Sequence, residues 1–364
     1  MSNIKSFQRI SSCLLILLLA VGCQSAQANL PPPSVTTAKT TPIPLLTPSN
    51  TLVPSPTATS TITPSPTATL HPLTIESLRM ISFPGSPITF EQRLENGANH
   101  ERHLVSYQSE GLKIYALMTI PLGDPPPGGF PAIIFNHGYI PPREYRTTER
   151  YVAYVNGFAS RGYVVFRPDY RGHGNSEGEA RGAYSNPDYT IDVLNALASV
   201  RAYPQVNPEK IGMWGHSMGG HLTLRSMVVS PHIRAGVIWA GVIGSYEDMM
   251  YRWRATPVPT ISATSRRFAR QLIETYGSPE QNPSFWDSIS PINFVSALSG
   301  PIQLHHAVED SVVPVYFSER VYAAAQAAGM PVEFYTYAGD DHNIANAFSL
   351  AMQRSIDFFD RYLK

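Results

Sequence analysis

The sequence predicts an α/β fold, a mostly parallel sheet with helices on both faces, from three observations. Short apolar runs typical of buried strands alternate with helix-like stretches from residue 131 onward. A Gly-x-Ser-x-Gly motif at 215–219 stands between such a run and a helix. The polar motifs follow the carboxyl ends of the predicted strands, where sites lie in parallel sheets.

The predicted elements follow one another in the order that such a sheet requires. The strands are Ile88–Leu94, His103–Ser109, Lys113–Ile120, Pro131–Asn136, Tyr163–Arg167, Ile211–Gly215, Ala235–Val242, Ile302–Ala307 and Val332–Tyr337. The helices are Glu149–Arg161, Asn186–Arg201, Gly220–Val229, Val315–Ala328 and Ile344–Tyr362. The second helix has a clear start, because Asn186 suits a helix cap and Pro187 suits the first helical position.

The stretch at about 244–291 interrupts this alternation. It holds two tryptophans and a basic helix-like run with Arg266, Arg267 and Arg270. Its place in the chain is that of a cap inserted over a site, and a cap excludes water and shapes a substrate pocket. The arginines either bind an acidic group of the substrate or form a solvated helix face, and we expect the solvated face.

Composition limits the partners and the chemistry. The 27 basic and 27 acidic side chains give a net charge of zero, which offers no argument for nucleic acid or another polyanion. The only cysteines of the 364-residue chain are Cys13 and Cys23, so the remainder has no disulfide and no thiolate metal site. From residue 76 onward there are close to 290 residues, enough for one large domain.

The first 23 residues have the pattern of an export signal. Lys5 and Arg9 precede an apolar run that is too short to span a bilayer, which takes about 20 apolar residues. The sequence Leu19-Ala-Val-Gly-Cys23 resembles a bacterial lipoprotein cleavage box, although Ala20 stands where leucine is usual. This resemblance implies a lipid-modified Cys23 that anchors the protein on the outer side of a cell membrane. The alternative is ordinary cleavage near Ala28, which would release a soluble protein.

Residues 24–75 are rich in Pro, Thr and Ser and almost uncharged. The run Val53-Pro-Ser-Pro-Thr-Ala-Thr59 returns ten residues later as Thr63-Pro-Ser-Pro-Thr-Ala-Thr69. Such a segment cannot bury apolar surface and favours extended polyproline II structure. We therefore expect a disordered linker, and a catalytic domain over 76–364.

The Gly-x-Ser-x-Gly motif, Gly215-His-Ser-Met-Gly219, identifies Ser217 as a candidate nucleophile. A serine on a sharp turn from strand to helix needs small neighbours two places away, and the turn lifts its hydroxyl to the top of the sheet. The hydroxyl is a poor nucleophile until a base takes its proton, and the base needs an acid that orients it.

Both partners follow Ser217 in the order serine, acid, histidine. Asp310 lies just beyond the strand Ile302–Ala307, and His342 lies just beyond the last predicted strand. Glu309 is the alternative acid, but adjacent side chains point in different directions and we expect Asp310. The other histidines after Ser217 lie within a helix or a strand or are less well placed, so we expect His342 to be the base.

Acyl transfer also needs hydrogen-bond donors for the developing oxyanion. The backbone N–H of Met218 directly follows the nucleophile, and the backbone N–H of Tyr139 lies in the loop after Pro131–Asn136. His137 in the same loop either acts directly or is bonded to backbone, and we expect His173 to be structural. No histidine and carboxylate group has metal-ligand spacing, and no phosphate or dinucleotide motif occurs, so we predict neither metal nor cofactor.

These motifs together resemble one family. They are His137-Gly-Tyr139, Asp169–Gly174, Asn207–Gly212, Gly215–Gly220, Asp310–Pro314 and the pair Gly339 and His342. Over about residues 105–364 the chain resembles an α/β-hydrolase, and more closely the catalytic domain of the prolyl-oligopeptidase family of serine peptidases. The resemblance implies an α/β-hydrolase fold and a triad of Ser217, Asp310 and His342. Large members carry an N-terminal β-propeller that gates peptides, and here the linker stands in its place.

We therefore expect a serine hydrolase that cleaves peptide or amide bonds of small substrates through an acyl-enzyme. The alternative is a carboxylesterase acting on small esters, because the same catalytic domain without a propeller is also similar to acyl esterases. A more distant alternative is a binding lipoprotein on a hydrolase scaffold. The sequence leaves the acyl group and the oligomeric state open.

Overall fold

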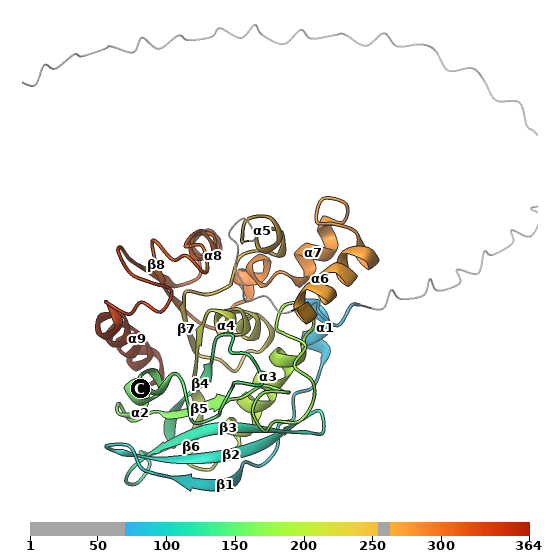
Figure 1. Ribbon diagram of the computed structural model, residues 1–364. Helices are drawn as coiled ribbons and strands as arrows, with labels where there is room; N and C mark the ends of the chain where they lie inside the picture. The colour runs from blue at the N-terminus through green and yellow to red at the C-terminus, as the bar shows by residue number, and fades with distance from the viewer. Residues whose placement is uncertain (1–69, 254–262) are drawn as a thin grey trace, which may run out of the picture. The chain divides into compact units, whose positions relative to one another are not determined.

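A nine-stranded sheet forms the centre of the catalytic domain in the computed structural model, which describes residues 70–253 and 263–364 and only the backbone of 263–269 (Figure 1). Its strands are β1 (Thr89–Leu94), β2 (His100–Ser109), β3 (Leu112–Pro121), β4 (Phe130–Asn136), β5 (Val164–Pro168), β6 (Val206–His216), β7 (Ala235–Trp239), β8 (Ile302–Ala307) and β9 (Val332–Tyr337). The spatial order is β1-β2-β3-β5-β4-β6-β7-β8-β9. The first three pairings of this order are antiparallel and the rest are parallel, so the sheet is mostly parallel as the sequence predicts.

Alternating side chains of the central strands enter two separate cores. In β4, Ala132 and Ile134 join the core beneath α3 and α4, whereas Ile133 and Phe135 join the core beneath α2 and α9. This division follows from the two-residue period of a strand, and both faces are apolar because helices cover both (Figure 1).

The helices that cover these faces come from all parts of the described chain. They are α1 (Ile75–Met80), α2 (Val152–Ala159), α3 (Asp188–Arg201), α4 (Met218–Val229), α5 (Tyr246–Tyr251), α6 (Ala263–Tyr276), α7 (Pro283–Ile289), the 3-10 helix η2 (Pro291–Ala297), α8 (Tyr316–Ala327) and α9 (Phe348–Leu363). Helices α5 to α7 occupy the stretch at 244–291 that interrupts the sequence pattern. Arg270 is exposed on α6, while the side chains of Arg266 and Arg267 lie outside the described residues.

Several predicted boundaries are corrected by turns of the chain. Strand β7 ends at Trp239 rather than Val242, because Ala240 has a positive φ of 45°. Helix α2 begins at Val152 rather than Glu149, because the two residues before it also have positive φ. Helix α3 begins at Asp188, one residue later than predicted, and the Asn186 side chain accepts the N–H of Asp188 at 3.0 Å, which is the bond expected of a cap at Asn186. Such turns depend on tertiary contacts as well as on local propensity.

The last helix also begins later than predicted, at Phe348 rather than Ile344. The preceding residues form a loop that closes on Asp340, whose carboxylate accepts the N–H groups of Asn346 at 3.0 Å and Ala347 at 2.8 Å. Asp340 thus closes the turn that precedes α9.

The domain begins before the predicted boundary at residue 76. Leu73 and Ile75 are fully buried, and Thr74 caps α1 by accepting the N–H of Ser77. The buried guanidinium of Arg225 on α4 donates to the Leu73 carbonyl. Residues 70–75 therefore belong to the folded domain, and the sequence assigned them to the linker because short helices carry little periodic signal.

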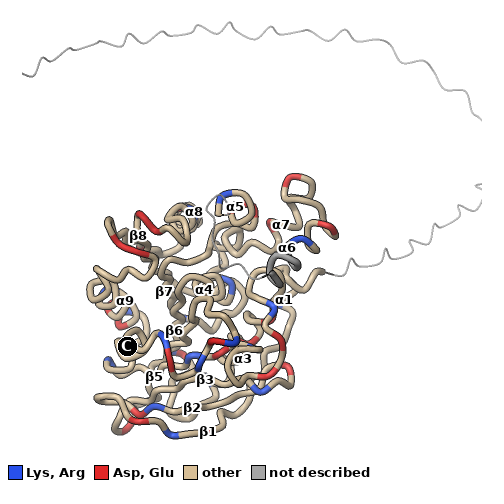
Figure 2. Tube along the Cα trace, viewed as in Figure 1, with Lys and Arg blue, Asp and Glu red and all other residues tan. Residues whose placement is uncertain are grey.

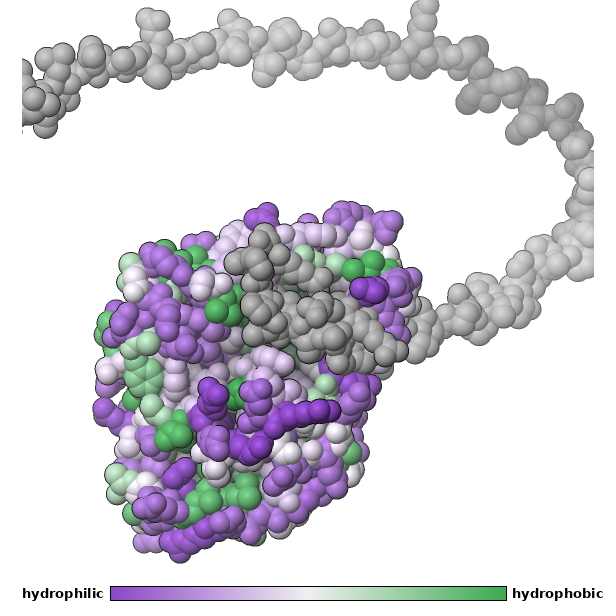
Figure 3. Space-filling model, in the orientation of Figure 1, coloured by the Kyte–Doolittle hydropathy of each residue, from purple (hydrophilic) through white to green (hydrophobic). Residues whose placement is uncertain are grey.

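Charged and apolar surface residues are mixed over the domain. Figure 2 shows acidic and basic positions scattered along the described trace, in keeping with the net charge of zero. On the face drawn in Figure 3, hydrophobic residues are interspersed among hydrophilic ones. Within the described ranges, no helix combines the length and apolar character that crossing a membrane requires.

The packing of the segment before α1 can be tested with a matched pair of leucines. Leu73 is fully buried, whereas Leu70 is 41% exposed. Leu73→Ala should lower the free energy of unfolding by about 2–5 kcal/mol, because it leaves a cavity in the core. Leu70→Ala should change it by less than about 0.5 kcal/mol. Urea unfolding measures the free energy of unfolding of both variants. An equally small change in both would place the start of the domain after these residues.

Candidate active site

Ser217 lies at the turn between β6 and α4, and close packing explains the residues around it. Its backbone has φ 55° and ψ −118°, a conformation that costs a non-glycine residue about 1–3 kcal/mol. A Cβ on Gly215 would lie 2.2 Å from the Gly219 carbonyl oxygen, and a Cβ on Gly219 would lie 1.9 Å from the Asn136 carbonyl oxygen. Glycine is therefore required at both positions.

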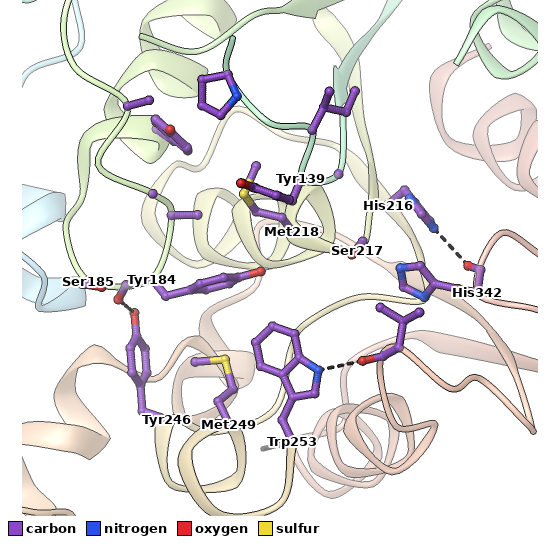
Figure 4. A pocket seen from close by; sticks show the side chains of 18 of the residues that line it. Tyr139, Tyr184, Ser185, His216, Ser217, Met218, Tyr246, Met249, Trp253 and His342 are labelled. Atoms are coloured by element: carbon purple, nitrogen blue, oxygen red, sulfur yellow. Dashed lines mark hydrogen bonds between the residues drawn. The ribbon is translucent and has the colours of Figure 1, made fainter. Parts of the chain in front are cut away.

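Neighbouring strands hold this turn in place. The N–H of Ser217 donates to the Trp239 carbonyl at 3.0 Å, and the Ser217 carbonyl accepts from Val242 at 3.1 Å. Ser217 thus stays at the carboxyl edge of the sheet with its side chain partly exposed to a cavity (Figure 4).

Asp310 and His342 are hydrogen-bonded in the loops after β8 and β9. The Nδ1 atom of His342 donates to Oδ2 of Asp310 at 2.7 Å. The other oxygen of Asp310 accepts the N–H groups of Val312 at 2.8 Å and Val313 at 3.0 Å. His342 lines the same cavity as Ser217. The alternative acid, Glu309, instead accepts the N–H of Gly339 at 2.7 Å.

His306 is a second histidine beside Asp310. Its Nε2 lies 3.2 Å from Oδ2 of Asp310 and 2.9 Å from the Val313 carbonyl, and its Nδ1 lies 2.7 Å from the Ser318 hydroxyl. Burial alone would raise the pKa of Asp310, but hydrogen bonds from His306 and His342 outweigh it and hold that pKa well below its ordinary value. Asp310 is therefore a carboxylate that can orient and stabilise a protonated His342.

The two predicted oxyanion donors lie beside Ser217. Met218 is the first residue of α4, and Tyr139 lies in the loop after β4; both line the cavity. Gly138 brings this loop close, since a Cβ there would lie 3.2 Å from the Cβ of Ser217. Among the hydrogen bonds of the described residues, neither the N–H of Met218 nor that of Tyr139 donates one. Both groups are therefore free to bind a substrate oxygen.

The two histidines of uncertain role lie behind the cavity. His137 is fully buried between the rings of Tyr145 and Tyr170, and its Nδ1 donates to the Gly138 carbonyl at 2.7 Å. His173 is also buried. Burial lowers the pKa of His173 to about 4, so its ring is neutral. Of the two roles that the sequence allows for His137, a direct one and a bond to backbone, the structure shows the bond to backbone.

Sequence reasoning missed two residues that the structure brings to the site. His216 precedes Ser217, and its Nε2 lies 3.0 Å from the His342 carbonyl oxygen. Tyr151 lies before α2, and its hydroxyl is 2.8 Å from Nδ1 of His216. His216 occupies a variable position of the motif, and nothing local in the sequence marks Tyr151.

The cavity in front of Ser217 has a volume of about 560 Å³ and a largely apolar wall (Figure 4). Trp253, Trp286 and Tyr246 come from the segment between β7 and β8, and each has its polar group bonded to backbone, at Val312, Gly277 and Tyr184 respectively. Among the described lining residues the only permanently charged one is Arg150. The wall therefore offers aromatic and aliphatic surface to a ligand.

No metal site accompanies this cavity in the part of the chain that the structure describes. Within residues 70–253 and 263–364, no three His, Cys, Asp or Glu side chains gather in a way that could hold a metal ion.

Comparison with known proteins matches the chain to one family and one fold. A model of the prolyl oligopeptidase family matches residues 150–364. The uncharacterized peptidase YtmA of Bacillus subtilis is 25% identical over 257 residues, which are 70% of this chain and 91% of that protein.

Two solved structures share the fold. Acylaminoacyl peptidase of Pyrococcus horikoshii has a TM-score of 0.59 at 22% identity, over 74% of this chain and 42% of that one. Acetyl xylan esterase of Paenibacillus sp. R4 has a TM-score of 0.58 at 17% identity, over 78% of this chain and 91% of that one. The chain thus spans less than half of the peptidase and most of the esterase.

The choice between the two adjacent acids can be tested directly. Asp310→Asn should lower kcat for a p-nitrophenyl ester by about 10⁴-fold, because an amide can favour the wrong tautomer of His342. Glu309→Gln should change kcat little, because its amide oxygen can still accept the Gly339 N–H. A large loss in the Glu309 variant together with an active Asp310 variant would reverse the assignment.

Proposed function

Because the chain belongs to the prolyl oligopeptidase family it is a serine hydrolase, and we propose that Ser217, His342 and Asp310 are its catalytic triad. The observation that carries this proposal is the hydrogen bond of 2.7 Å between His342 and Asp310 in the cavity wall that also bears Ser217. We propose further that the enzyme cleaves peptide or amide bonds of small substrates.

The mechanism starts with attack of the Ser217 hydroxyl oxygen on the substrate carbonyl carbon. Nε2 of His342 takes the hydroxyl proton, and Asp310 stabilises the resulting imidazolium. The N–H groups of Met218 and Tyr139 donate to the oxyanion of the tetrahedral intermediate. Collapse of the intermediate breaks the bond to the leaving amine, which receives the proton from His342.

Water completes the reaction on the acyl-enzyme. His342 takes a proton from the water as its oxygen attacks the acyl carbon, and then returns a proton to the Ser217 oxygen as the ester bond breaks. The products are an acid and an amine, and the enzyme is regenerated without a cofactor.

The cavity wall favours substrates that are apolar around the scissile bond. The polar groups of Trp253, Trp286 and Tyr246 in this wall already donate hydrogen bonds to backbone carbonyls. None of the described lining residues is Asp or Glu. A free amino group close to the scissile bond would therefore lose its hydration without gaining an ion pair from them, which is costly.

A carboxylesterase acting on small esters is the second candidate. It is favoured by the match to an acetyl xylan esterase over 91% of that chain's length, against 42% for the acylaminoacyl peptidase. Ester and amide hydrolysis use the same triad, and the difference lies in how well the leaving amine is protonated.

A substrate panel separates these candidates. The purified protein should hydrolyse N-acetyl-phenylalanine p-nitroanilide faster than phenylalanine p-nitroanilide by more than about tenfold, because the second carries an unpaired ammonium group. Ser217→Ala should remove this activity and covalent labelling by a fluorophosphonate, whereas Ser185→Ala in the same cavity wall should keep the labelling.

The outcomes are distinct for each candidate. Hydrolysis of p-nitrophenyl butyrate without any anilide hydrolysis would reject the peptidase and support the esterase. Preference for the free amine would contradict the inference from the cavity wall. Absence of labelling at Ser217 in folded protein would reject both.

We propose that the domain is exported and tethered by a lipid on Cys23. This residue and the linker lie outside the described residues, so the support is the cleavage-box pattern and the composition of 24–69. In bacterial cells the intact protein should fractionate with membranes, and Cys23→Ala should not carry the lipid. A Cys23→Ala protein that stays in the membrane fraction would contradict the anchor, and a wild-type protein in the medium would favour cleavage near Ala28.

A further inference from the structure

The loop that carries Tyr139 is fixed at both polar groups of Gly138. The N–H of Gly138 donates to the Tyr151 hydroxyl oxygen at 2.9 Å, and its carbonyl accepts from Nδ1 of His137 at 2.7 Å. The Gly138 carbonyl and the Tyr139 N–H belong to one peptide group. A hydrogen bond that fixes the carbonyl therefore also fixes the direction of the Tyr139 N–H. The same bond polarises the peptide group and so makes this N–H a stronger donor.

The Tyr151 hydroxyl continues this connection through His216 to the loop of His342. A carbonyl can only accept, so Nε2 of His216 carries the proton that it donates to the His342 carbonyl at 3.0 Å. Burial lowers the pKa of His216 to about 3, so the ring is neutral and its Nδ1 is an acceptor. The Tyr151 hydroxyl must then donate to Nδ1, which is 2.8 Å away.

Every donor in this chain of hydrogen bonds is therefore assigned. It runs from the Gly138 N–H to Tyr151, from Tyr151 to His216, and from His216 to the His342 carbonyl. Burial raises the pKa of Tyr151 to about 12, so the hydroxyl keeps its proton. Because that proton is used on His216, Tyr151 is not itself a donor to the oxyanion.

A buried arginine holds Tyr151 in an unusual backbone conformation. Arg150 and Tyr151 have φ of 54° and 51° in succession. Arg167 on β5 is 1% exposed, and its guanidinium donates to the Arg150 carbonyl at 2.6 Å and to the Thr147 carbonyl. The Thr147 hydroxyl in turn donates to buried Asp169 at 2.5 Å. Strained backbone that the surrounding structure holds in place is typical of functional sites.

We propose that Tyr151 and His216 are positioning residues that tie the loop of the oxyanion donor Tyr139 to the loop of the base His342. The tie keeps the donor N–H aligned on the substrate carbonyl and the imidazole aligned on the Ser217 hydroxyl, so that no reorganisation is needed when charge develops. This inference rests on the proposed function, in which Ser217 forms an acyl-enzyme. Figure 4 shows His216 bonded to the backbone of His342, beside Ser217.

The test removes one hydroxyl from the tie. Tyr151→Phe keeps the ring that packs against Phe135 and Trp214. We expect kcat for the best substrate of the panel to fall about 10–100-fold, with KM within about threefold, because misalignment affects the transition state more than substrate binding. Binding of a trifluoromethyl ketone, which forms a tetrahedral adduct, should weaken by a similar factor.

Two further variants separate positioning from folding. Tyr163→Phe removes a buried hydroxyl that bonds to Asp360 at 2.6 Å, away from the cavity, and should keep kcat. His216→Leu should lower kcat as Tyr151→Phe does, and His216→Gln, which can donate and accept, should restore part of it. If both residues act through one tie, the double variant Tyr151→Phe with His216→Leu should be little worse than either single variant.

Several results would overturn the inference. Unchanged kcat in Tyr151→Phe, a rise in KM alone, or losses that multiply in the double variant would each do so. If Tyr151→Phe fails to fold, as judged by urea unfolding, the comparison of His216→Leu with His216→Gln decides instead, and equal loss in both would count against the tie. Failure of the proposed function is distinguishable, because wild-type Ser217 would then not react with a fluorophosphonate.

Discussion

The close contact between the turn at Ser217 and the end of β4 is the constraint on which the rest of the site depends. The Cα of Gly219 lies so near the Asn136 carbonyl that a Cβ there would come within 1.9 Å of the oxygen. This contact places the start of α4 against the loop that begins at His137. One tight packing interaction therefore brings Ser217 and both candidate oxyanion donors together, and the strained φ of Ser217 is its cost.

Around this contact the domain keeps His137 and His216 neutral and Asp310 ionised. Burial lowers the pKa of His216 to about 3 and that of His137 well below its ordinary value. Asp310 behaves in the opposite way, because it receives hydrogen bonds from His306, His342 and two backbone N–H groups. A neutral ring can have one assigned donor and one assigned acceptor, which is what a fixed chain of hydrogen bonds requires.

The cavity and the catalytic edge come from different parts of the chain and have different chemistry. The edge presents polar groups at the ends of β4, β6, β8 and β9. The segment between β7 and β8 adds the aromatic wall, whose polar atoms are bonded to backbone. The same kind of edge can serve peptidases and esterases, because function depends on the site and not on the fold alone.

The sequence by itself determined the fold class, most strands and the candidate triad residues, because each depends on neighbours along the chain. The sequence shows three such patterns directly: the alternation of strands and helices, the glycines around Ser217, and the order of Asp310 and His342. The early start of the domain could not be predicted, because it depends on the contact of Arg225 with Leu73. The late start of α9 could not be predicted either, because it depends on the bonds that Asp340 accepts from the loop before it. Only the tertiary structure decided the tie from Gly138 to His342. Two of its three bonds join residues 65 and 126 positions apart, and no local pattern encodes a contact between residues so distant in the chain.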